Sequence, residues 1–586
     1  MPPWHPTLGA IALPGDRCHF RVWAPKCKSV AVRLLDRTGQ LLPLEPRDGG
    51  YFEIFANDVP PGTRYLYCLD NRRERPDPVS RHQAEGVHGP STIVDRAFAW
   101  TDTDWRGLPF ADLILYELHV GTYTADGSFD AIIPHLDGLA DLGINALELL
   151  PLAQTPGVRN WGYDGVYLFA PRDDYGGPAG LKRLVDAAHA RGMAVLQDVV
   201  YNHLGPEGNY LRDFGHYFTE RHHTPWGSAI NVAYDHSDAV RAFFLENAQM
   251  WQHEYHLDGL RLDAVQEIPD GTARSFLAEL ADTVQGQERP FHLIAETSAN
   301  DIRNVRPTSA CGFGMDAVWN DDFHHSLRAL LTPDRNGYYQ DFGSVALHAR
   351  AWREGFSFQG EFYAYRGRRH GSPTTGLDAS HFVIYNQNHD QVGNRARSNR
   401  LIVEAGFAAA KVAAASMLLS PYVPMLFMGE EFAETAPFPF FVDHGDPHLI
   451  DATRRGRAAE YAEFLQPHEM PDPQDAATFA SAKLSHDRGS PEMLRFYRDL
   501  IRLRRTLPAL RAPRENMDSL VEEAAKRLTI RRWSAKDEVW LVFGFSPSPS
   551  AVEPPMGQWR VLLDSAAPEY GDPGAGQRVL VFGRPE

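Results

Sequence analysis

Two kinds of hydrophobic pattern divide the chain. In the first hundred residues, apolar side chains alternate with polar ones, as in Val30, Val32 and Leu34. A period of two is typical of strands that bury one face. Runs of this kind, separated by Gly, Pro and Asp turns, predict a small β-sandwich; they lie at residues 18–24, 29–36, 51–57 and 63–70.

From about residue 110 onward, continuous apolar runs alternate with segments of helical periodicity. In one helical segment the apolar residues are spaced i, i+3, i+4 and i+7; they are Leu181, Leu184, Val185 and Ala188. Unbroken apolar runs are typical of parallel strands that helices cover. Eight such runs predict an α/β fold with a (β/α)8, or TIM, barrel; they lie at 113–120, 144–151, 194–203, 259–265, 292–298, 317–323, 382–390 and 423–431.

The end of the barrel is marked by a helix start. Ser490 is a favoured capping residue, and Pro491 after it suits the first helical position. Strand-like runs return beyond residue 512, at 538–545 and 559–564. We therefore predict an immunoglobulin-like β-sandwich at 1–95, a catalytic barrel at 108–512 and a small C-terminal β-domain at 513–586.

Two connections are longer than plain barrel loops need to be. They lie at 204–237 and 332–380, and both are rich in aromatic residues, His, Gly and Arg. Long loops in compact domains tend to be functional. We expect these two to form a groove for a flat polar ligand.

Charge and composition narrow the functional class. Lys and Arg total 58 and Asp and Glu total 76, so the formal net charge is −18. Proteins that bind nucleic acids or membrane surfaces need a basic face. We therefore expect neither a nucleic acid nor a membrane as partner. No run of about 18 consecutive apolar residues occurs, so we also expect no membrane-spanning helix.

The cysteines indicate the compartment. Cys18, Cys27, Cys68 and Cys311 form no CxxC pair and are too few for a disulfide framework. We expect free thiols in a reducing cytosol. The first 16 residues lack a basic stretch and a sustained apolar run, so no signal peptide is expected. The chain is therefore predicted to be cytoplasmic.

Ionisable residues follow four of the predicted barrel strands. A single carboxylate at a strand end is usually part of a salt bridge or a helix cap. Ionisable residues at four strand ends weaken that interpretation, because the carboxyl ends of barrel strands surround one pocket. The residues are Asp198 and His203 on the third strand, Arg261 and Asp263 on the fourth, Glu296 on the fifth, and His389 and Asp390 on the seventh.

Two or three carboxylates in one pit suit the cleavage of glycosides, which needs one protonated and one ionised group. Arg261 lies two residues before Asp263 on the same strand, so its charge would keep Asp263 ionised. Glu296 follows the apolar run 293–295 and is better placed for a raised pKa and the role of acid.

Other chemistries are less well supported. His253 and His256 are one residue too close together for the HExxH zinc helix. The sequence has no GxSxG, P-loop or GxGxxG motif. Two adjacent histidine pairs, 222–223 and 324–325, could ligate a metal, but sugar contacts or plain loop exposure are favoured.

These strand ends resemble the four sequence regions shared by the α-amylase superfamily of glycoside hydrolases. The early sandwich is similar to the N-terminal domain of glycogen-branching and debranching relatives. The resemblance implies a retaining mechanism in which Asp263 is the nucleophile, Glu296 the general acid/base and Asp390 the transition-state stabiliser. It also implies that the sugar in the cleaved subsite is bound by Trp161, Tyr163, His203, Arg261 and His389.

Six further segments carry a finer resemblance; they are 76–81, 85–91, 319–325, 360–371, 429–432 and 437–441. They resemble segments of the malto-oligosyltrehalose trehalohydrolases. That family hydrolyses the α-1,4 bond next to a terminal trehalose unit. The resemblance implies malto-oligosyltrehalose and α-glucan oligosaccharides as substrates and a malto-oligosyltrehalose synthase as functional partner. It makes Asp322, His325 and Glu430 plausible trehalose contacts, with a structural role as the alternative for each.

Two further points depend on this resemblance. Many amylases hold calcium through the residue equivalent to Asn202, but the family is similar to relatives without calcium, so we expect no metal and no other cofactor. Two alternatives stay open. One is a glycogen-branching enzyme or general α-glucan hydrolase of the same superfamily, and the other is an inactive glucan-binding protein. The intact set of Asp263, Glu296 and Asp390 argues against the latter.

Overall fold

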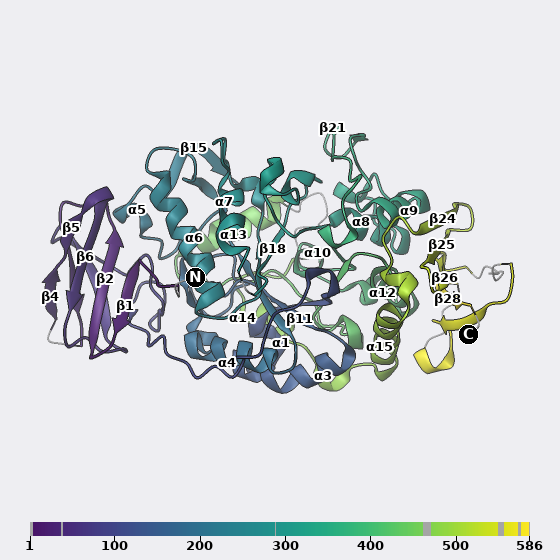
Figure 1. The fold of residues 1–586 in the computed structure, drawn as a ribbon, viewed down its shortest axis with the longest axis horizontal. Helices are drawn as coiled ribbons and strands as arrows, with labels where there is room; N and C mark the ends of the chain where they lie inside the picture. Colours follow the sequence, from purple (N-terminus) through teal and green to yellow (C-terminus); the bar gives the residue numbers. More distant parts are fainter. Residues whose placement is uncertain are drawn as a thin grey trace.

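The barrel lies between two β-structures, one at each end of an elongated molecule (Figure 1). The computed structural model describes residues 4–36, 39–287, 289–395, 397–460, 470–548, 556–571 and 576–584. Its central sheet is a closed barrel of parallel strands, so the predicted fold class is confirmed. Around the barrel the strands are β10 (Leu115–Leu118), β11 (Ala146–Leu149), β14 (Ala194–Val199), β17 (Gly259–Leu262), β18 (His292–Ala295), β19 (Ala317–Trp319), β22 (Phe382–Tyr385) and β23 (Val423–Phe427).

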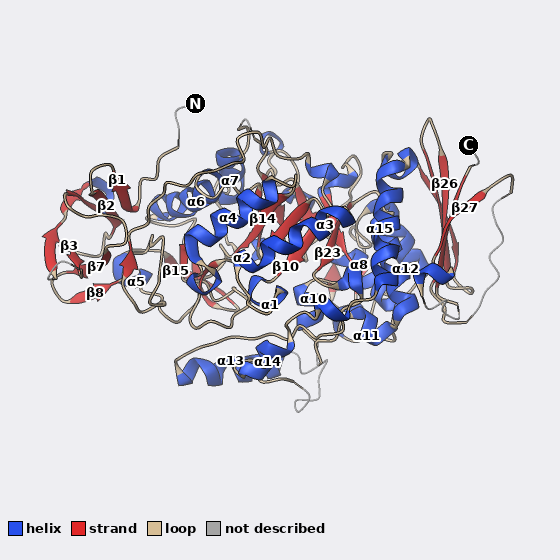
Figure 2. Cartoon of the chain, turned by 90° about the horizontal axis from the view of Figure 1, so that it is seen from below, coloured by secondary structure: helices blue, strands red, loops and turns tan. Residues whose placement is uncertain are grey.

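Helices surround the barrel strands on the outside (Figure 2). No helix among the described residues is long and apolar enough to cross a membrane. The longer helices are α3 (Leu136–Leu142), α4 (Gly177–His189), α6 (Ser237–His253), α7 (Phe276–Val284), α8 (Asp321–Leu331), α9 (Val345–Glu354), α12 (Phe407–Leu418), α13 (Pro447–Glu460) and α15 (Pro491–Thr506). The shorter ones are α1 (Val120–Tyr123), α2 (Phe129–Ile132), α5 (Leu211–Phe214), α10 (His389–Gly393), α11 (Leu401–Ala405) and α14 (Ala476–Ser481).

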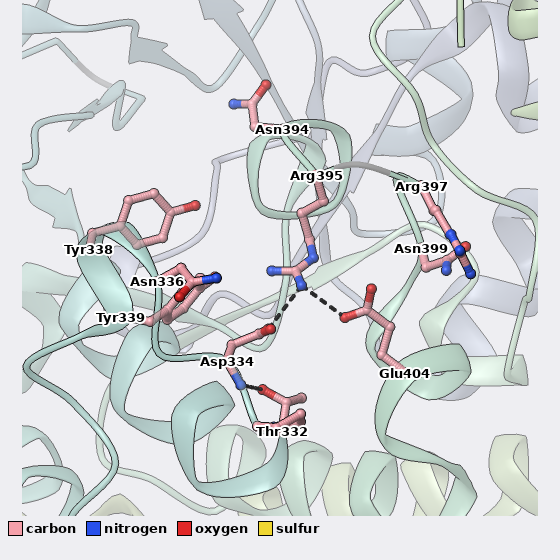
Figure 3. Close-up of a pocket in the computed structure, with 11 residues that line it drawn as sticks. Thr332, Asp334, Asn336, Tyr338, Tyr339, Asn394, Arg395, Arg397, Asn399 and Glu404 are labelled. Carbon is pink, nitrogen blue, oxygen red and sulfur yellow. Dashed lines mark hydrogen bonds and ion pairs between the residues drawn. The ribbon is translucent and has the colours of Figure 1, made fainter. Parts of the chain in front are cut away.

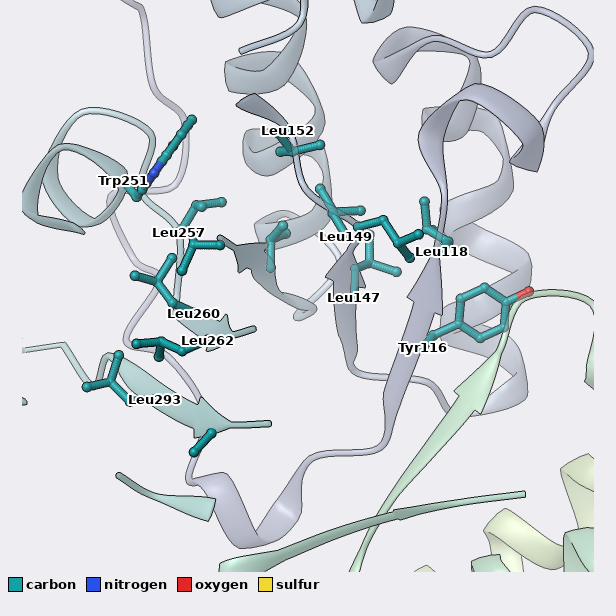
Figure 4. Close-up of a cluster of buried hydrophobic side chains, with 14 of the residues drawn as sticks. Tyr116, Leu118, Leu147, Leu149, Leu152, Trp251, Leu257, Leu260, Leu262 and Leu293 are labelled. Carbon is teal, nitrogen blue, oxygen red and sulfur yellow. The ribbon is translucent and has the colours of Figure 1, made fainter. Parts of the chain in front are cut away.

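Each barrel strand turns alternate side chains inward and outward, although its sequence is apolar throughout. In β10, Tyr116 and Leu118 point outward into the layer under the helices, and Leu115 belongs to a separate cluster inside the barrel. Figure 4 shows the outer layer, with Leu147 and Leu149 of β11 and Leu260 and Leu262 of β17. The inward positions near the carboxyl ends of the strands are left for polar groups, and this layering positions the active site.

The N-terminal region is a sandwich of two antiparallel sheets. Alternation along β2 buries Cys18, Phe20 and Val22 between them. One sheet has the order β1 (Gly9–Leu13), β2 (Arg17–Trp23), β6 (Tyr51–Ala56), β5 (Glu45–Arg47). The other has the order β4 (Gln40–Pro43), β3 (Val30–Leu34), β7 (Arg64–Leu69), β8 (Arg73–Arg75), with β9 (Ser91–Thr92) paired to β7.

Polar contacts fasten the sandwich to the barrel region. Arg73 and Arg75 both bind the carboxylate of Asp213 in α5, at 2.5 and 2.7 Å. At the start of the described chain, the backbone N–H groups of Thr7 and Leu8 donate to Glu246 of α6 at 2.8 and 2.9 Å. The sandwich is thus tied to the outer wall of the barrel at two separate places.

The C-terminal region is one five-stranded antiparallel sheet that packs on α9 and α12. Its strands, in spatial order, are β24 (Met517–Glu522), β25 (Arg527–Trp533), β26 (Glu538–Gly544), β28 (Arg578–Gly583) and β27 (Arg560–Asp564). The domain boundaries at 95, 108 and 512 stay predictions.

The two long connections contain short elements of their own. The first holds α5 and the hairpin β15 (Phe218–Thr224) with β16 (Gly227–Ile230). The second holds α9 and the hairpin β20 (Phe362–Tyr363) with β21 (Arg368–Arg369). A further short hairpin, β12 (Ala153–Gln154) with β13 (Tyr167–Pro171), brackets the segment that carries Tyr163.

The helix start predicted at Ser490 is confirmed. The Ser490 hydroxyl accepts a hydrogen bond from the backbone N–H of Met493 at 3.1 Å, and Pro491 is the first residue of α15. We expect Ser490→Ala to lower the free energy of unfolding by about 1 kcal/mol, because an N–H at the helix end loses its acceptor. Urea titration measures this change. Ser485→Ala is the control, because the Ser485 hydroxyl has no hydrogen bond to a described residue. Equal losses of unfolding free energy in the two variants would contradict the capping role of Ser490.

Candidate active site

One buried arginine lies at the centre of the predicted site. Arg261 points inward from β17 and is fully buried. Its Nη1 donates to Asp198 Oδ2 of β14 at 2.6 Å and to Asp263 Oδ1 at 2.9 Å. Its Nη2 lies 3.8 Å from Glu296 Oε2, beyond the end of β18. Carboxylates from three neighbouring strands therefore share one cation.

Asp263 accepts hydrogen bonds at both carboxylate oxygens. Arg261 occupies Oδ1, and Asn202 Nδ2 donates to Oδ2 at 2.7 Å and to the Asp263 carbonyl at 2.7 Å. Both partners are donors, which suits an ionised carboxylate. Arg261 and Asn202 therefore fix the Asp263 carboxylate in place, as the predicted role of nucleophile requires.

The residue after Asp263 turns the backbone toward Glu296. Ala264 has a φ of 40° and a ψ of 54°, in the left-handed region that non-glycine residues rarely adopt. This turn aims the Ala264 N–H at Glu296 Oε2, at 2.6 Å. A strained conformation of this kind is retained when the surroundings fix it, and here it joins the two predicted reacting carboxyl groups.

Glu296 has the ionisation expected of a general acid. Burial raises the pKa of Glu296 to about 8, against the lowering effect of Arg261. Its side chain keeps 19% of its surface exposed, and it lines the active-site cleft described below. At neutral pH the group is therefore protonated and still able to reach a substrate.

A chain of hydrogen bonds links this centre to the opposite side of the barrel. Glu117 of β10 accepts from His389 Nδ1 at 2.6 Å and from the His389 backbone N–H at 3.0 Å. The other ring nitrogen, Nε2, lies 2.7 Å from the Tyr163 hydroxyl, which donates to Asp198 Oδ2 at 2.6 Å. Asp198 then meets Arg261. We call this chain the relay.

Because the Tyr163 hydroxyl donates to Asp198, His389 Nε2 donates to that hydroxyl when His389 is doubly protonated. Burial alone would lower the pKa of His389, but Asp390 and Glu117 beside it raise that pKa to about 9. Asp390 lies on the side of His389 that faces the cleft described below, with its Oδ2 3.6 Å from His389 Nε2. The imidazolium thus has Glu117 at its Nδ1 and Asp390 near its Nε2.

The cleft beside these groups has a volume of about 580 Å³. Glu296 and Asp390 lie in its wall, with Trp319, whose ring stacks on the Arg261 guanidinium at 4.1 Å. Both long connections contribute. The first supplies Pro225, and the second supplies Tyr338, Tyr363, Tyr365, Arg366 and His370. Aromatic rings beside amide and charged groups suit a polyhydroxylated ligand.

None of the other three predicted sugar contacts near the cleaved bond is in the cleft lining, and of these three only Tyr163 is not buried. The Tyr163 ring is partly exposed and stacks on His389. His203 bonds to the Asn202 amide, and its ring stacks on Trp226 with a centroid distance of 4.4 Å. Trp161 is only 2% exposed and packs between His389 and Phe438. Its position favours support of His389 over direct contact with sugar.

The three predicted trehalose contacts are also divided. Asp322 and His325 line the cleft. The Asp322 carboxylate also accepts from Asn300 and from two backbone N–H groups, so it fixes the cleft wall. Glu430 lies outside the cleft lining, with Tyr497 at 3.2 Å and Gln387 at 3.3 Å as hydrogen-bond donors. Its place favours a structural role.

Sequence reasoning missed Glu117 as part of the site. Glu117 is the one acidic residue in the apolar run 113–120, and Glu148 has the same place in the run 144–151. The two residues face each other in the parallel register of β10 and β11. A carboxylate inside a buried strand was the available signal. Asp198 was noticed at a strand end, but its link to Tyr163 depends on the fold.

The metal prediction is not tested. The Asn202 side chain, which was considered for calcium, is bonded to Asp263 and His203. Within the described part of the chain, no group of three or more His, Cys, Asp or Glu side chains could hold a metal ion.

Two family models match regions of this chain. Residues 93–227 match the family described as alpha amylase, catalytic domain, and residues 7–82 match carbohydrate-binding module 48, the isoamylase N-terminal domain. A malto-oligosyltrehalose trehalohydrolase of Saccharolobus solfataricus is 45% identical over 84% of this chain and 85% of its own.

Two further relatives are informative. The crystal structure of a protein from Salmonella typhimurium, provisionally named an alpha amylase, has a TM-score of 0.90 and 38% identity, and covers 99% of this chain and 100% of its own. A 1,4-alpha-glucan branching enzyme of Bordetella parapertussis is 28% identical over 99% of this chain and 79% of its own. The chain is thus more distant from the branching enzyme than from the trehalohydrolase.

The state of Glu296 predicts a pH dependence. A general acid works only when protonated, so kcat/KM should fall as the pH rises through about 8, the pKa to which burial raises Glu296. Initial rates on an oligosaccharide substrate measure this limb. If activity stayed constant well above this pH, Glu296 would not be the acid.

The relay predicts a role for Glu117. In Glu117→Gln the charge that stabilises the His389 imidazolium is lost, so the pKa of His389 should drop below that of Glu296. The alkaline limb should then move to lower pH, and kcat/KM at neutral pH should fall roughly 10- to 100-fold.

Glu148→Gln is the matched control for Glu117→Gln. Glu148 is as buried as Glu117 and lies opposite it, but it does not bond to His389. Burial, together with Glu117, raises the pKa of Glu148 well above its ordinary value, so this substitution replaces a neutral group by another. A uniform loss in Glu117→Gln with no shift of the limb, or the same shift in both variants, would contradict the relay.

Proposed function

Because this chain belongs to the malto-oligosyltrehalose trehalohydrolases, a family of glycoside hydrolases in the α-amylase superfamily, we propose that Asp263, Glu296 and Asp390 carry its reaction. The reaction is hydrolysis of the α-1,4-glucosidic bond next to the terminal trehalose unit of malto-oligosyltrehalose. It releases trehalose and a malto-oligosaccharide, and it belongs to trehalose biosynthesis.

The observation that carries the assignment of roles is the difference between two carboxyl groups on one arginine. Arg261 and Asn202 both donate to the carboxylate of Asp263, whereas burial raises the pKa of Glu296 to about 8 and so keeps it protonated at neutral pH. One charged and one neutral carboxyl group, both beside the reacting bond, are what glycoside cleavage requires.

The first step follows from these states. Asp263 attacks C1 of the glucose unit at the end of the glucan, and the bond from C1 to the trehalose oxygen breaks. Glu296 gives its proton to that oxygen, so trehalose leaves as a neutral alcohol. Asp390 lies beside the imidazolium of His389, and its negative charge would stabilise the oxocarbenium-like carbon in the transition state.

The second step returns the enzyme to its starting state. Glu296, now ionised, takes a proton from water, and the water oxygen attacks C1 from the face that trehalose left. The ester bond to Asp263 breaks and the glucan leaves. Two inversions at C1 retain the α configuration.

The cell compartment and the partner are also proposals. All four cysteines are free, which supports a reducing cytoplasm. We propose that a malto-oligosyltrehalose synthase supplies the substrate. In a mixture of such a synthase with maltopentaose, free trehalose should form only after this enzyme is added. Trehalose formation by the synthase alone would remove the need for this partnership.

Product analysis separates the proposed function from its alternatives. Malto-oligosyltrehalose should yield free trehalose, and maltopentaose should be cut much more slowly. Equal cleavage of both without trehalose would favour a general α-glucan hydrolase, and new α-1,6 branches on amylose would favour a branching enzyme. Loss of activity in Asp263→Ala would exclude trace contamination and the inactive glucan-binding alternative.

The role of Glu296 has its own test. Glu296→Gln removes the proton donor, so the loss of kcat/KM should be roughly 100- to 10,000-fold for substrates whose leaving group needs a proton. For an activated substrate such as a glycosyl fluoride, the loss in the first step should be much smaller. Equal losses on both substrates would contradict the role of Glu296 as the acid.

A further inference from the structure

The carboxylate of Asp390 is held less firmly than that of Asp263. Its side chain is 40% exposed, and its Oδ2 lies 3.6 Å from His389 Nε2, too far for a hydrogen bond. Among the described residues, one side chain donates a hydrogen bond to this carboxylate, because Asn394 Nδ2 lies 3.0 Å from Asp390 Oδ1. Asp263, by comparison, accepts at both of its oxygens. The direction in which the Asp390 carboxylate points therefore depends on Asn394.

Asn394 lies at the end of α10, one helical turn after Asp390. Its backbone N–H donates to the Asp390 carbonyl at 2.9 Å, so the two side chains are neighbours on one face of the helix. The next residue, Arg395, anchors this end of α10 through ion pairs with Asp334 at 2.9 Å and Glu404 at 3.1 Å. Figure 3 shows the side chains of Asn394 and Arg395 pointing in opposite directions. The anchor thus fixes the backbone and leaves the Asn394 amide on the other side.

An arginine from a helix distant in the sequence determines which way round this amide lies. Arg457 of α13 donates from Nη2 to Asn394 Oδ1 at 3.1 Å. A guanidinium has donors only, so it selects the amide oxygen and leaves the Nδ2 hydrogens directed at Asp390. If the amide were turned by half a rotation, its oxygen would face the carboxylate, and neither group could donate. Arg457 therefore favours the orientation in which Asn394 holds Asp390.

Arg457 also connects α13 to the residues that support His389. Figure 2 shows α13 set apart from the helices that surround the barrel. The Arg457 guanidinium carbon lies 4.4 Å from the centre of the Phe440 ring, and its Nη2 donates to the Gly393 carbonyl at the end of α10 at 3.4 Å. Phe440 packs edge-on against Trp161, with a centroid distance of 5.1 Å, and Trp161 packs against His389. The Arg457 side chain is therefore held in place where it meets Asn394.

We propose that Arg457 is a positioning residue, which orients the Asn394 amide so that Asn394 directs the Asp390 carboxylate into the cleft. The proposal rests on the proposed function, in which Asp390 stabilises the charge that develops at C1. Arg457 is not part of the cleft lining, so it acts through Asn394 and not on the substrate. A charge that is already oriented stabilises a transition state better than one that must turn during the reaction. Loss of Arg457 would thus slow the chemical step without weakening substrate binding.

Arg457→Met tests the proposal, because methionine keeps an apolar side chain on Phe440 but removes the donor. The kcat on malto-oligosyltrehalose should fall roughly 3- to 10-fold, the effect of one hydrogen bond, and KM should stay unchanged. Asn394→Ala removes the direct donor to a charged group, so its loss in kcat should be larger, roughly 10- to 100-fold. In the double variant, Arg457→Met should cause no further loss, because the amide that it orients is gone.

The choice of substrate adds a second measurement. Charge develops at C1 with any leaving group, so Arg457→Met should lower kcat/KM by the same factor on malto-oligosyltrehalose and on a glycosyl fluoride. Arg455→Met is the matched control, because it removes the same charge from the same helix. The Arg455 side chain is 77% exposed and lies 4.0 Å from Asp451, also on α13. This variant should keep the wild-type kcat and KM.

Three results would overturn the proposal. They are a loss in Arg457→Met that appears in KM alone, an equal loss in Arg455→Met, and an undiminished effect of Arg457→Met when Asn394 is already alanine. Asp390→Ala distinguishes these from a failure of the proposed function. If that variant kept the wild-type kcat, the proposed role of Asp390 would fail and this proposal with it, whereas additive losses at Arg457 and Asn394 would overturn this proposal alone.

Discussion

The buried guanidinium of Arg261 is the interaction on which the rest of the site depends. A cation without water around it is costly unless several acceptors surround it. Asp198, Asp263 and Glu296 surround this one, and each comes from a different strand or strand end. The parallel pairing of β14, β17 and β18 brings their ends together, and the shared cation links the carboxylates there. The predicted nucleophile and acid are brought together by the same strand pairing that forms the barrel.

Around this centre, the protein gives chemically similar groups different protonation states. Arg261 and Asn202 donate hydrogen bonds to Asp263. Glu296 lies farther from the same arginine, and burial raises its pKa. On the far side, Glu117 holds His389 as a cation, and the Tyr163 hydroxyl joins the two halves.

The fold, and the placement of the proposed reacting groups at strand ends, could be predicted because both are local in the sequence. An apolar run followed at once by Asp263 or Glu296 identifies a buried strand and what stands at its end. Glu117 is different, because its role depends on the inward and outward alternation within β10 and on a partner far along the chain. Trp161 and Glu430 show what a sequence motif does not determine. Their motifs were noticed, but whether a side chain meets the ligand or supports a neighbour depends on packing, which a motif does not contain.

The central claim is that Asp263 attacks the sugar while Glu296 protonates the leaving oxygen. A fluorinated glucosyl fluoride tests it most directly, because the fluorine slows the second step and the covalent intermediate accumulates. Peptide mass spectrometry of the trapped enzyme then locates the sugar. The account predicts a glycosyl ester on Asp263. An adduct on Asp198, Glu296 or Asp390, or turnover with inversion and no adduct, would contradict it.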